Sequence, residues 1–235
     1  MTEHTVLPYQ TEALGPTHSR AEPSYAALLG PAWLNLPPPV QARFGSTAHA
    51  KQTRIYAGQV LATELSLAGA ILAQLARLVG GPMPYTSSAL GPSVVAVTRV
   101  CAFTPDGTGA DVWTRSYARP GRFPQVIQSA KCFAGPTGLE ERLGFGLVMR
   151  LNVNVDGPPG RADLVFTSAG YRLRIGRLDL PLPDALSPGH CEVRHRDEGD
   201  GAFTFTLTIT HPRFGRLLRQ VARYHDHPSP QGDTP

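Results

Sequence analysis

A short alternating segment carries the side chains best suited to hold a small polar ligand. Trp113, Arg115 and Tyr117 are spaced two residues apart, so in a β-strand they share one face. Aromatic side chains around a guanidinium can bind a carboxylate or another polar headgroup. The alternatives are a solvent-facing ladder of cross-strand pairs, or core aromatics that flank an Arg paired with Glu141. We predict Trp113, Arg115 and Tyr117 as ligand-binding residues.

Glu141 is the carboxylate of greatest chemical interest. Inside an apolar barrel its pKa would rise, and the group could then act as a general acid or base. The alternative is a structural role, either in an ion pair with Arg115 or on the outer surface of a strand.

Two residues near the end of the chain are further candidates for acid–base chemistry. His211 precedes Pro212, which favours an extended conformation at a strand end, and functional residues are common at such positions. His211 could act as a general base with Tyr224 as a donor, or its ring could cap the turn. Glu141, His211 and Tyr224 are thus the catalytic candidates, and the sequence leaves open whether the protein is an enzyme.

Metal and cofactor motifs are not evident. His190, Cys191 and His195 are close in sequence, but a strand would place the two histidines on opposite faces, so we predict no metal. Glycine-containing turns such as Gly107–Gly109 fall in hairpins rather than between a strand and a helix. A dinucleotide fingerprint therefore lacks its structural context, and we predict no cofactor.

The composition restricts the partners and the compartment. The net charge is +4, and Lys51 and Lys131 are the only lysines among the 22 basic residues. The arginines are spread along the predicted strands rather than clustered with aromatics, so we do not predict nucleic-acid binding. Three widely spaced cysteines favour reduced thiols and a cytoplasmic location. No apolar run reaches the roughly 18 residues of a membrane-spanning helix.

The elements that must position these residues are mostly strands. Period-2 alternation recurs from Asp111 to Asp226, which is typical of half-buried antiparallel strands. Apolar residues at intervals of three and four predict one long helix over residues 63–79, with Thr63 as its cap. A short helical segment begins near Ser24, and we interpret residues 217–225 as a strand.

These patterns predict an α+β fold: a strongly curved antiparallel sheet, or an incomplete β-barrel, of about 8–10 strands packed against the long helix. Residues 1–22 are predicted to form a disordered N-terminal arm and residues 227–235 a disordered tail. Residues 23–226 are predicted to form a single domain.

A series of short motifs resembles a known bacterial protein family, the domain of unknown function 4166 (DUF4166). The motifs are Leu29-Gly30-Pro-Ala-Trp33, Leu36-Pro37-Pro38, Val79-Gly80-Gly81-Pro82, Trp113-Thr-Arg115-Ser-Tyr117, Ser129, Glu141-Arg142-Leu143-Gly144, Leu180-Pro181-Leu182-Pro183, His211-Pro212-Arg-Phe-Gly215 and Tyr224. The resemblance covers residues 24–226 and implies no particular activity. It also implies a functional association with a reductase-like protein, because related domains are fused to reductase-like domains.

Three functional hypotheses follow. The first is a protein that binds a small apolar or amphipathic molecule in a sheet-enclosed cavity of several hundred cubic ångströms. The second is an enzyme of the isomerase or cyclase type that uses Glu141, Arg115, His211 or Tyr224 in that cavity. The third is a structural module that binds a partner through an exposed apolar surface.

Overall fold

The computed structural model describes residues 23–45, 53–78, 83–84, 90–100, 103 and 109–226 of the chain. The predicted N-terminal arm, residues 1–22, and the predicted tail, residues 227–235, lie outside the described residues.

Three short helical segments open the described part of the chain: the α-helix α1 (Tyr25–Leu29), the 3-10 helix η1 (Gly30–Asn35) and the α-helix α2 (Pro38–Phe44). Ser24 caps α1, since its Oγ accepts a hydrogen bond from the Ala27 N–H at 3.2 Å. Proline in the first turn of η1 and of α2 is tolerated, because the amides there have no partner within the helix. The predicted helical opening is confirmed.

Eleven antiparallel strands make up most of the rest of the described chain. They are β1 (Thr53–Leu65), β2 (Gly91–Val100), β3 (Ala110–Arg119), β4 (Arg122–Cys132), β5 (Leu139–Gly144), β6 (Leu147–Asp156), β7 (Asp163–Ile175), β8 (Leu178–Leu182), β9 (His190–Gly199), β10 (Ala202–His211) and β11 (Gly215–Asp226). A second 3-10 helix, η2 (Asp184–Leu186), lies between β8 and β9. The predicted antiparallel sheet is confirmed.

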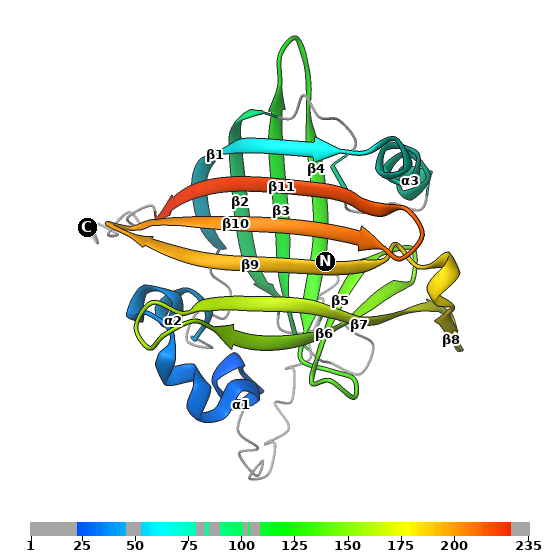
Figure 1. Ribbon diagram of the computed structural model, residues 1–235. Helices are drawn as coiled ribbons and strands as arrows, with labels where there is room; N and C mark the ends of the chain where they lie inside the picture. Colours follow the sequence, from blue (N-terminus) through cyan, green and yellow to red (C-terminus); the bar gives the residue numbers. More distant parts are fainter. Residues whose placement is uncertain are drawn as a thin grey trace, which may run out of the picture.

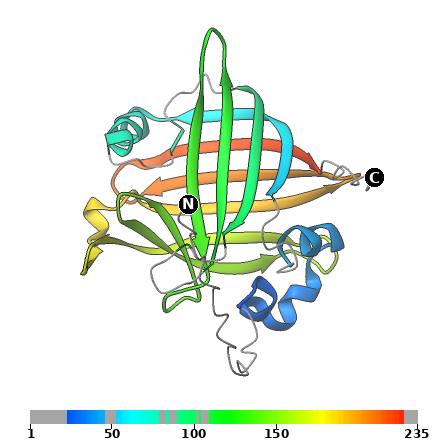
Figure 2. The same ribbon diagram turned by 180° about the vertical axis from the view of Figure 1, so that it is seen from behind.

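The sheet closes on itself as a barrel. Its strand order is β6-β5-β4-β3-β2-β1-β11-β10-β9-β7-β8, and β6 also pairs with β7, so every strand except β8 belongs to the ring. In Figure 1, β1 and β9–β11 cross in front of β2–β4 at a steep angle, and Figure 2 shows the same crossing from behind. This crossing reflects the strong twist and tilt that closure requires.

The prediction of an incomplete barrel is wrong, and β7 is the reason. This strand is long and continues without interruption through Gly170 at φ 113°. One edge of β7 pairs along β6, while its other edge pairs first with β9 and then with β8. One continuous strand therefore pairs with β6 on one side and with β9 on the other, and this closes the ring.

The predicted long helix is also wrong in its extent. The helix α3 spans Leu67–Leu78, whereas Thr63–Leu65 continue β1 and pair with β11. Ser66, rather than Thr63, lies before the first helical turn, and its Oγ accepts a hydrogen bond from the Gly69 N–H at 3.1 Å. Strand pairing with β11 outweighs the helical periodicity of residues 63–65. Within the described residues, no helix is long and apolar enough to cross a membrane.

The last element is a strand, as interpreted from the sequence. Leu218, Gln220, Ala222 and Tyr224 of β11 are all buried, so alternate residues face the barrel interior. Their burial explains why this segment pairs between β1 and β10 instead of forming a helix.

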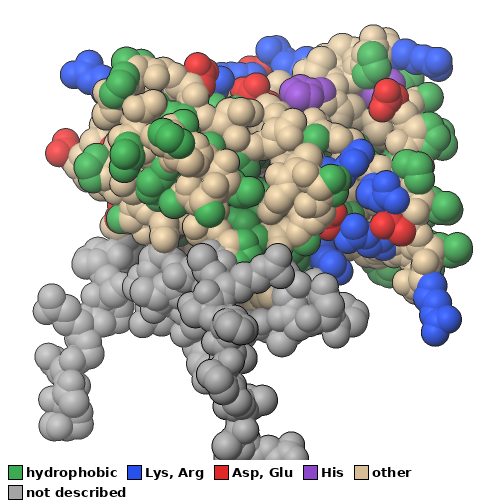
Figure 3. Space-filling view, turned by 90° about the horizontal axis from the view of Figure 1, so that it is seen from below, with side chains coloured by type: hydrophobic (Ala, Val, Ile, Leu, Met, Phe, Trp, Pro, Cys, Tyr) green, Lys and Arg blue, Asp and Glu red, His purple; other side chains and the backbone are tan. Residues whose placement is uncertain are grey.

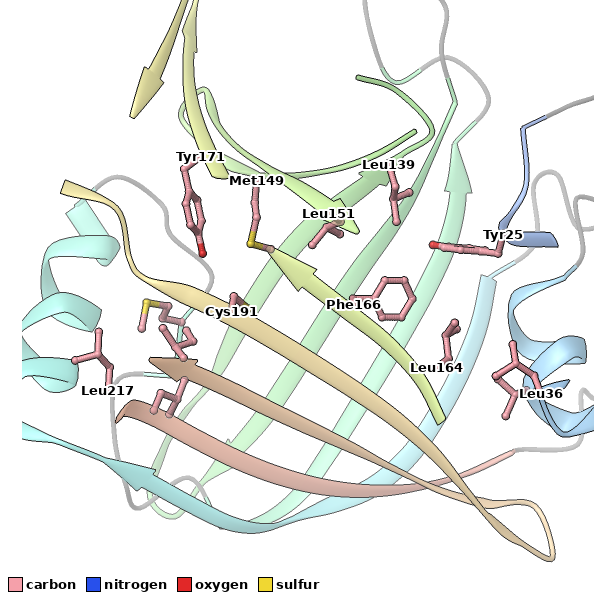
Figure 4. Close-up of a cluster of buried hydrophobic side chains, with 14 of the residues drawn as sticks. Tyr25, Leu36, Leu139, Met149, Leu151, Leu164, Phe166, Tyr171, Cys191 and Leu217 are labelled. Carbon is pink, nitrogen blue, oxygen red and sulfur yellow. The ribbon is translucent and has the colours of Figure 1, made fainter. Parts of the chain in front are cut away.

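The apolar core fills part of the barrel and extends beneath the helices. Figure 4 shows Leu139, Met149, Leu151 and Phe166 directed into one interior cluster, with Tyr25 of α1 beside them. The helices α1 and α2 lie near one end of the front strands, and α3 lies near the other (Figures 1 and 2). The two ends of the interior are therefore bordered by different helices.

The outer surface carries charges of both signs. On the face in Figure 3, basic and acidic side chains lie next to one another rather than in large patches of one sign. Ion pairs along the strands include Arg172–Asp179 at 2.6 Å and Arg194–Asp156 at 2.7 Å. Many of the arginines spread through the strands thus have acidic neighbours.

Candidate functional site

A cavity of about 150 Å³ lies inside the barrel, between its strands and α3. Most of the lining side chains are apolar, and Leu72 and Ala76 of α3 border it together with Met83. This volume is smaller than the several hundred cubic ångströms expected, because aromatic and aliphatic side chains from the ring fill much of the interior. An apolar cavity of this size holds a molecule such as benzene.

The predicted ligand-binding residues share the inner face of β3. Trp113, Arg115 and Tyr117 all line the cavity. Trp113 and Tyr117 are buried, whereas Arg115 is half-buried. The structure thus brings an arginine and two aromatic side chains to one wall of the cavity. Their role in ligand binding stays a prediction.

Strand register assembles a charged cluster on the neighbouring wall. Ser129 of β4 is opposite Trp113 of β3, and Lys131 of β4 is opposite Glu141 of β5. The Ser129 hydroxyl donates a hydrogen bond to Glu141 Oε1 at 2.5 Å, and Lys131 Nζ lies 3.1 Å from the same oxygen. Arg115 completes the cluster: its Nη1 donates to Ser129 Oγ at 3.2 Å, and its Nη2 lies 3.8 Å from Glu141 Oε1.

The carboxyl group of Glu141 is held in its ionised form rather than as a neutral proton donor. Burial raises the pKa of this carboxyl, but Lys131, Arg115 and the Ser129 hydroxyl together hold its pKa below the ordinary value. The expectation of a raised pKa is therefore wrong, because the sequence does not show that two cationic side chains converge on Glu141. The ionised carboxylate is suited to accept a proton or to balance a cation.

Lys131 was not among the candidates, although it lines the same cavity. Gln125, Ile127, Ser129 and Lys131 are all buried and alternate along the inner face of β4. Burial lowers the pKa of the Lys131 ammonium group, and Arg115 lowers it further, against the opposing effect of Glu141. The available sequence signal was the rarity of lysine in this arginine-rich chain.

The remaining two catalytic candidates lie in different places. Tyr224 lines the cavity, where burial raises the pKa of its phenol, and its hydroxyl lies 3.0 Å from Ser93 Oγ. His211 lies at the turn between β10 and β11, where its Nδ1 accepts a hydrogen bond from the Arg213 N–H at 3.1 Å and its ring packs on Phe214. His211 thus caps a turn and does not line the cavity with Glu141.

A second, smaller cavity of about 60 Å³ adjoins the first near α2. Phe44, Trp113 and Phe205 line both cavities and so lie between them. Around the smaller cavity, Tyr25 Oη, Trp113 Nε1 and both ring nitrogens of His195 are buried without a hydrogen-bond partner among the described residues. At about 30 Å³ per water molecule, the space has room for about two beside these polar atoms.

His195 is a neutral histidine in an aromatic environment. Its ring stacks on Phe203 at 5.1 Å between centroids and contacts Phe44 and Phe205 edge-on. Burial, reinforced by Arg43, lowers the pKa of His195 to about 3. His190, by contrast, is exposed. Within the described part of the chain, no group of three or more His, Cys, Asp or Glu residues is placed to hold a metal ion.

Comparison with known proteins identifies a family but no individual relative. The family model described as "Domain of unknown function (DUF4166)" matches residues 36–223. Comparison with curated proteins gave no match, and comparison with solved structures gave none. Since the family model spans all of the barrel except its final residues, the chain belongs to the DUF4166 family.

Proposed function

We propose that this protein binds a small amphipathic molecule inside the barrel, with the ligand's apolar body in the larger cavity and its anionic head beside Arg115 and Lys131. One observation carries the proposal: an apolar cavity of about 150 Å³ has two cationic side chains and one carboxylate in its wall.

The apolar lining supports a ligand with a hydrocarbon body. Val95, Ile127, Met149 and Leu207 are among the side chains that border the cavity. Pockets of this composition use a few polar groups to orient a mostly apolar ligand. The volume favours a molecule close to benzene in size, with rearrangement of α3 side chains needed for a longer one.

The charges support an anionic or hydrogen-bond-accepting head. Glu141 balances one of the two cations, Lys131 and Arg115, which leaves an excess of donors in a place where burial strengthens electrostatic attraction. The planar guanidinium of Arg115 matches the two oxygens of a carboxylate. A ligand with an ammonium group would meet two like charges there and bind poorly.

A second candidate function is an enzyme of the isomerase or cyclase type. The observation in its favour is that Arg115 and Glu141 lie 3.8 Å apart in the wall of a cavity that Tyr224 also lines. His211 is no longer part of this candidate, because it caps the turn between β10 and β11. Three further expectations stay predictions: that the protein is a module that binds a partner protein, that it associates with a reductase-like protein, and that it is located in the cytoplasm.

Binding is tested by tryptophan fluorescence. Trp33 and Trp113 are the two tryptophans, so Trp33→Phe leaves Trp113 in the cavity wall as the reporter. We expect pentanoate and pentan-1-ol to change its emission saturably, pentanoate with the higher affinity, and pentylammonium to bind weakest. The absence of a saturable change with all three compounds would contradict the proposal.

Arg115→Met tests the position of the head. The variant is expected to weaken pentanoate binding about tenfold or more and to leave pentan-1-ol binding within about twofold, because only the anion loses a charged hydrogen bond. Arg122→Met, at an exposed position where β4 begins, is the matched control and should change neither affinity. If the two substitutions weaken pentanoate binding equally, Arg115 does not contact the ligand's head.

A further inference from the structure

We propose that Lys131 is a nucleophile that forms an imine, and that the cavity takes a small aldehyde or ketone whose carbonyl carbon reaches Lys131 Nζ. The inference rests on the proposed function, since the cavity must first admit a small molecule, and it adds the chemical class of that molecule and a covalent step.

The position of Lys131 is that of a reacting group. Its side chain lines the cavity and is 8% exposed, on a strand whose inner face is otherwise occupied by Gln125, Ile127 and Ser129. Its Nζ lies 3.1 Å from Glu141 Oε1 and 4.8 Å from the centre of the Trp113 ring. A molecule in the cavity therefore meets an amine, a carboxylate and an aromatic surface in one wall.

The electrostatic surroundings make it easier for the Lys131 ammonium group to lose the proton that the reaction requires it to lose. The groups that act on Lys131 are Glu141 of β5, Arg115 of β3 and Cys191 of β9. Burial and Arg115 lower the pKa of Lys131, whereas Glu141 and Cys191 raise it, and the balance lies below the ordinary value. Burial in an apolar pocket and a neighbouring cation are the two devices that activate lysine for imine formation.

The chemistry balances with the groups in the wall. Glu141 accepts a proton from the Lys131 ammonium group, and the resulting neutral amine attacks the carbonyl carbon. A C–N bond forms, and a second proton passes from the nitrogen to the carbonyl oxygen, which becomes the hydroxyl group of a carbinolamine. Glu141 then gives its proton to that hydroxyl, the C–O bond breaks and water leaves, so that ammonium and carbonyl give iminium and water without any oxidant or reductant. The face of the Trp113 ring stabilises the cationic iminium, as does the Phe166 ring, whose centre lies 5.7 Å from Nζ.

A purely structural ion pair explains these observations less well. A buried pair is often no more stable than apolar residues of the same volume, and the surrounding barrel is rich in such residues. A structural pair also needs no adjoining cavity, whereas Lys131 and Glu141 both line one. A reaction with a molecule in that space accounts for the presence of an amine at this position.

Reductive trapping tests the proposal on the unmodified protein. The folded chain is incubated at pH 7 with pentanal and cyanoborohydride, which reduces an iminium to a stable secondary amine, and the labelled positions are mapped by peptide mass spectrometry. The competing amines are Lys51, the only other lysine, and the chain's terminal amine. We expect Lys131 to be labelled about tenfold or more faster than Lys51, and raising the pH to 10 to reduce that ratio.

Lys131→Arg should abolish the fast labelling, and Lys51→Arg should leave it unchanged. Glu141→Gln should move the pH profile of Lys131 labelling to lower pH, because the carboxylate raises the pKa of the lysine. If Glu141 transfers protons, Glu141→Gln should also lower the maximal rate of Lys131 labelling at high pH, whereas loss of a purely structural ion pair would shift the profile without lowering that rate. Labelling of Lys51 at least as fast as Lys131 in the unmodified protein would overturn the proposal, and that outcome depends on no variant folding.

The two proposals fail in distinguishable ways. If pentan-1-ol binds beside Trp113 but pentanal does not label Lys131, imine formation is excluded and the binding function stands. If pentan-1-ol, pentanoate and pentanal all fail to change Trp113 emission and Lys131 is not labelled, both proposals are excluded.

Discussion

His195 illustrates how a single buried residue reflects its position in the barrel. It lies on β9 among Phe44, Phe203 and Phe205, with both ring nitrogens lacking a partner among the described residues. Such a group is costly to bury and more costly to charge. The ring is therefore held neutral, in contrast to the buried Lys131, which has Glu141 as an ionic partner.

We predict that His195 makes the stability of the protein depend on pH. In the unfolded chain the imidazole binds a proton near pH 6.5, whereas in the folded protein its pKa is about 3. Stability is therefore complete above pH 6.5 and falls as the pH drops toward 3, because only the unfolded state takes up the proton. Between pH 7 and pH 5 the loss from this residue is about 2 kcal/mol.

Urea unfolding at pH 7 and pH 5 measures this effect. His195→Phe should reduce the difference in unfolding free energy between the two pH values by about 2 kcal/mol. His190→Phe, on the exposed end of the same strand, is the control and should leave the difference unchanged. An unaltered pH dependence in His195→Phe would show that the ring is accessible to protons in the folded state.

At the scale of elements, α3 is held close to β11 by a glycine. A Cβ atom added at Gly69 would lie 2.1 Å from the Leu217 carbonyl oxygen, which is backbone and cannot move aside cheaply. The Ser66 N–H donates to the same carbonyl at 3.0 Å, so the entry to the helix is fixed against the strand. This contact places Leu72 and Ala76 at the border of the larger cavity.

We predict that Gly69→Ala destabilises the protein by about 1–3 kcal/mol, the cost typical of overpacking. Helix propensity alone predicts the opposite sign, a gain of about 1 kcal/mol. Ile71→Ala, at an exposed position on the same helix, should change the free energy within about 0.5 kcal/mol. The urea midpoints of the two variants show the sign of the change in unfolding free energy. A stabilised Gly69→Ala protein would mean that α3 is not held in this close contact with β11.

At the scale of the whole molecule, barrel closure joins the strands into one unit. The ring leaves β8 as the strand that pairs on only one side, through β7. The helical opening packs on the same apolar core, since the ring of Tyr25 in α1 packs edge-on against that of Phe166 in β7, with 5.9 Å between the ring centres. We propose on this basis that residues 23–226 form a single domain.

A single domain should unfold in one cooperative transition. Trp33→Phe leaves Trp113 to report on the barrel, and Trp113→Phe leaves Trp33 to report on η1. Within each variant, tryptophan fluorescence and far-ultraviolet circular dichroism should give coincident urea transitions. A Trp33 transition at clearly lower urea than the loss of strand signal would instead identify the helical opening as a separate unit.

The sequence by itself determined much of the local structure. Alternation located most of the strands, including residues 217–225, because each has one face toward the interior. The same spacing placed Trp113, Arg115 and Tyr117 on one face, and proline and Ser24 marked the helical opening. These features depend on neighbours within a few residues along the chain, so they can be recognised without knowledge of the fold.

Only the tertiary structure decided closure of the barrel, the start of α3 and the composition of the candidate site. Whether β6 meets β7 depends on pairing between edges of strands, which alternation does not encode. The partners of Glu141 come from β3 and β4, and its pKa is lowered because those strands align Arg115, Ser129 and Lys131 with one carboxylate oxygen. Burial and Coulomb interaction depend on distances in space, which only the closed barrel defines.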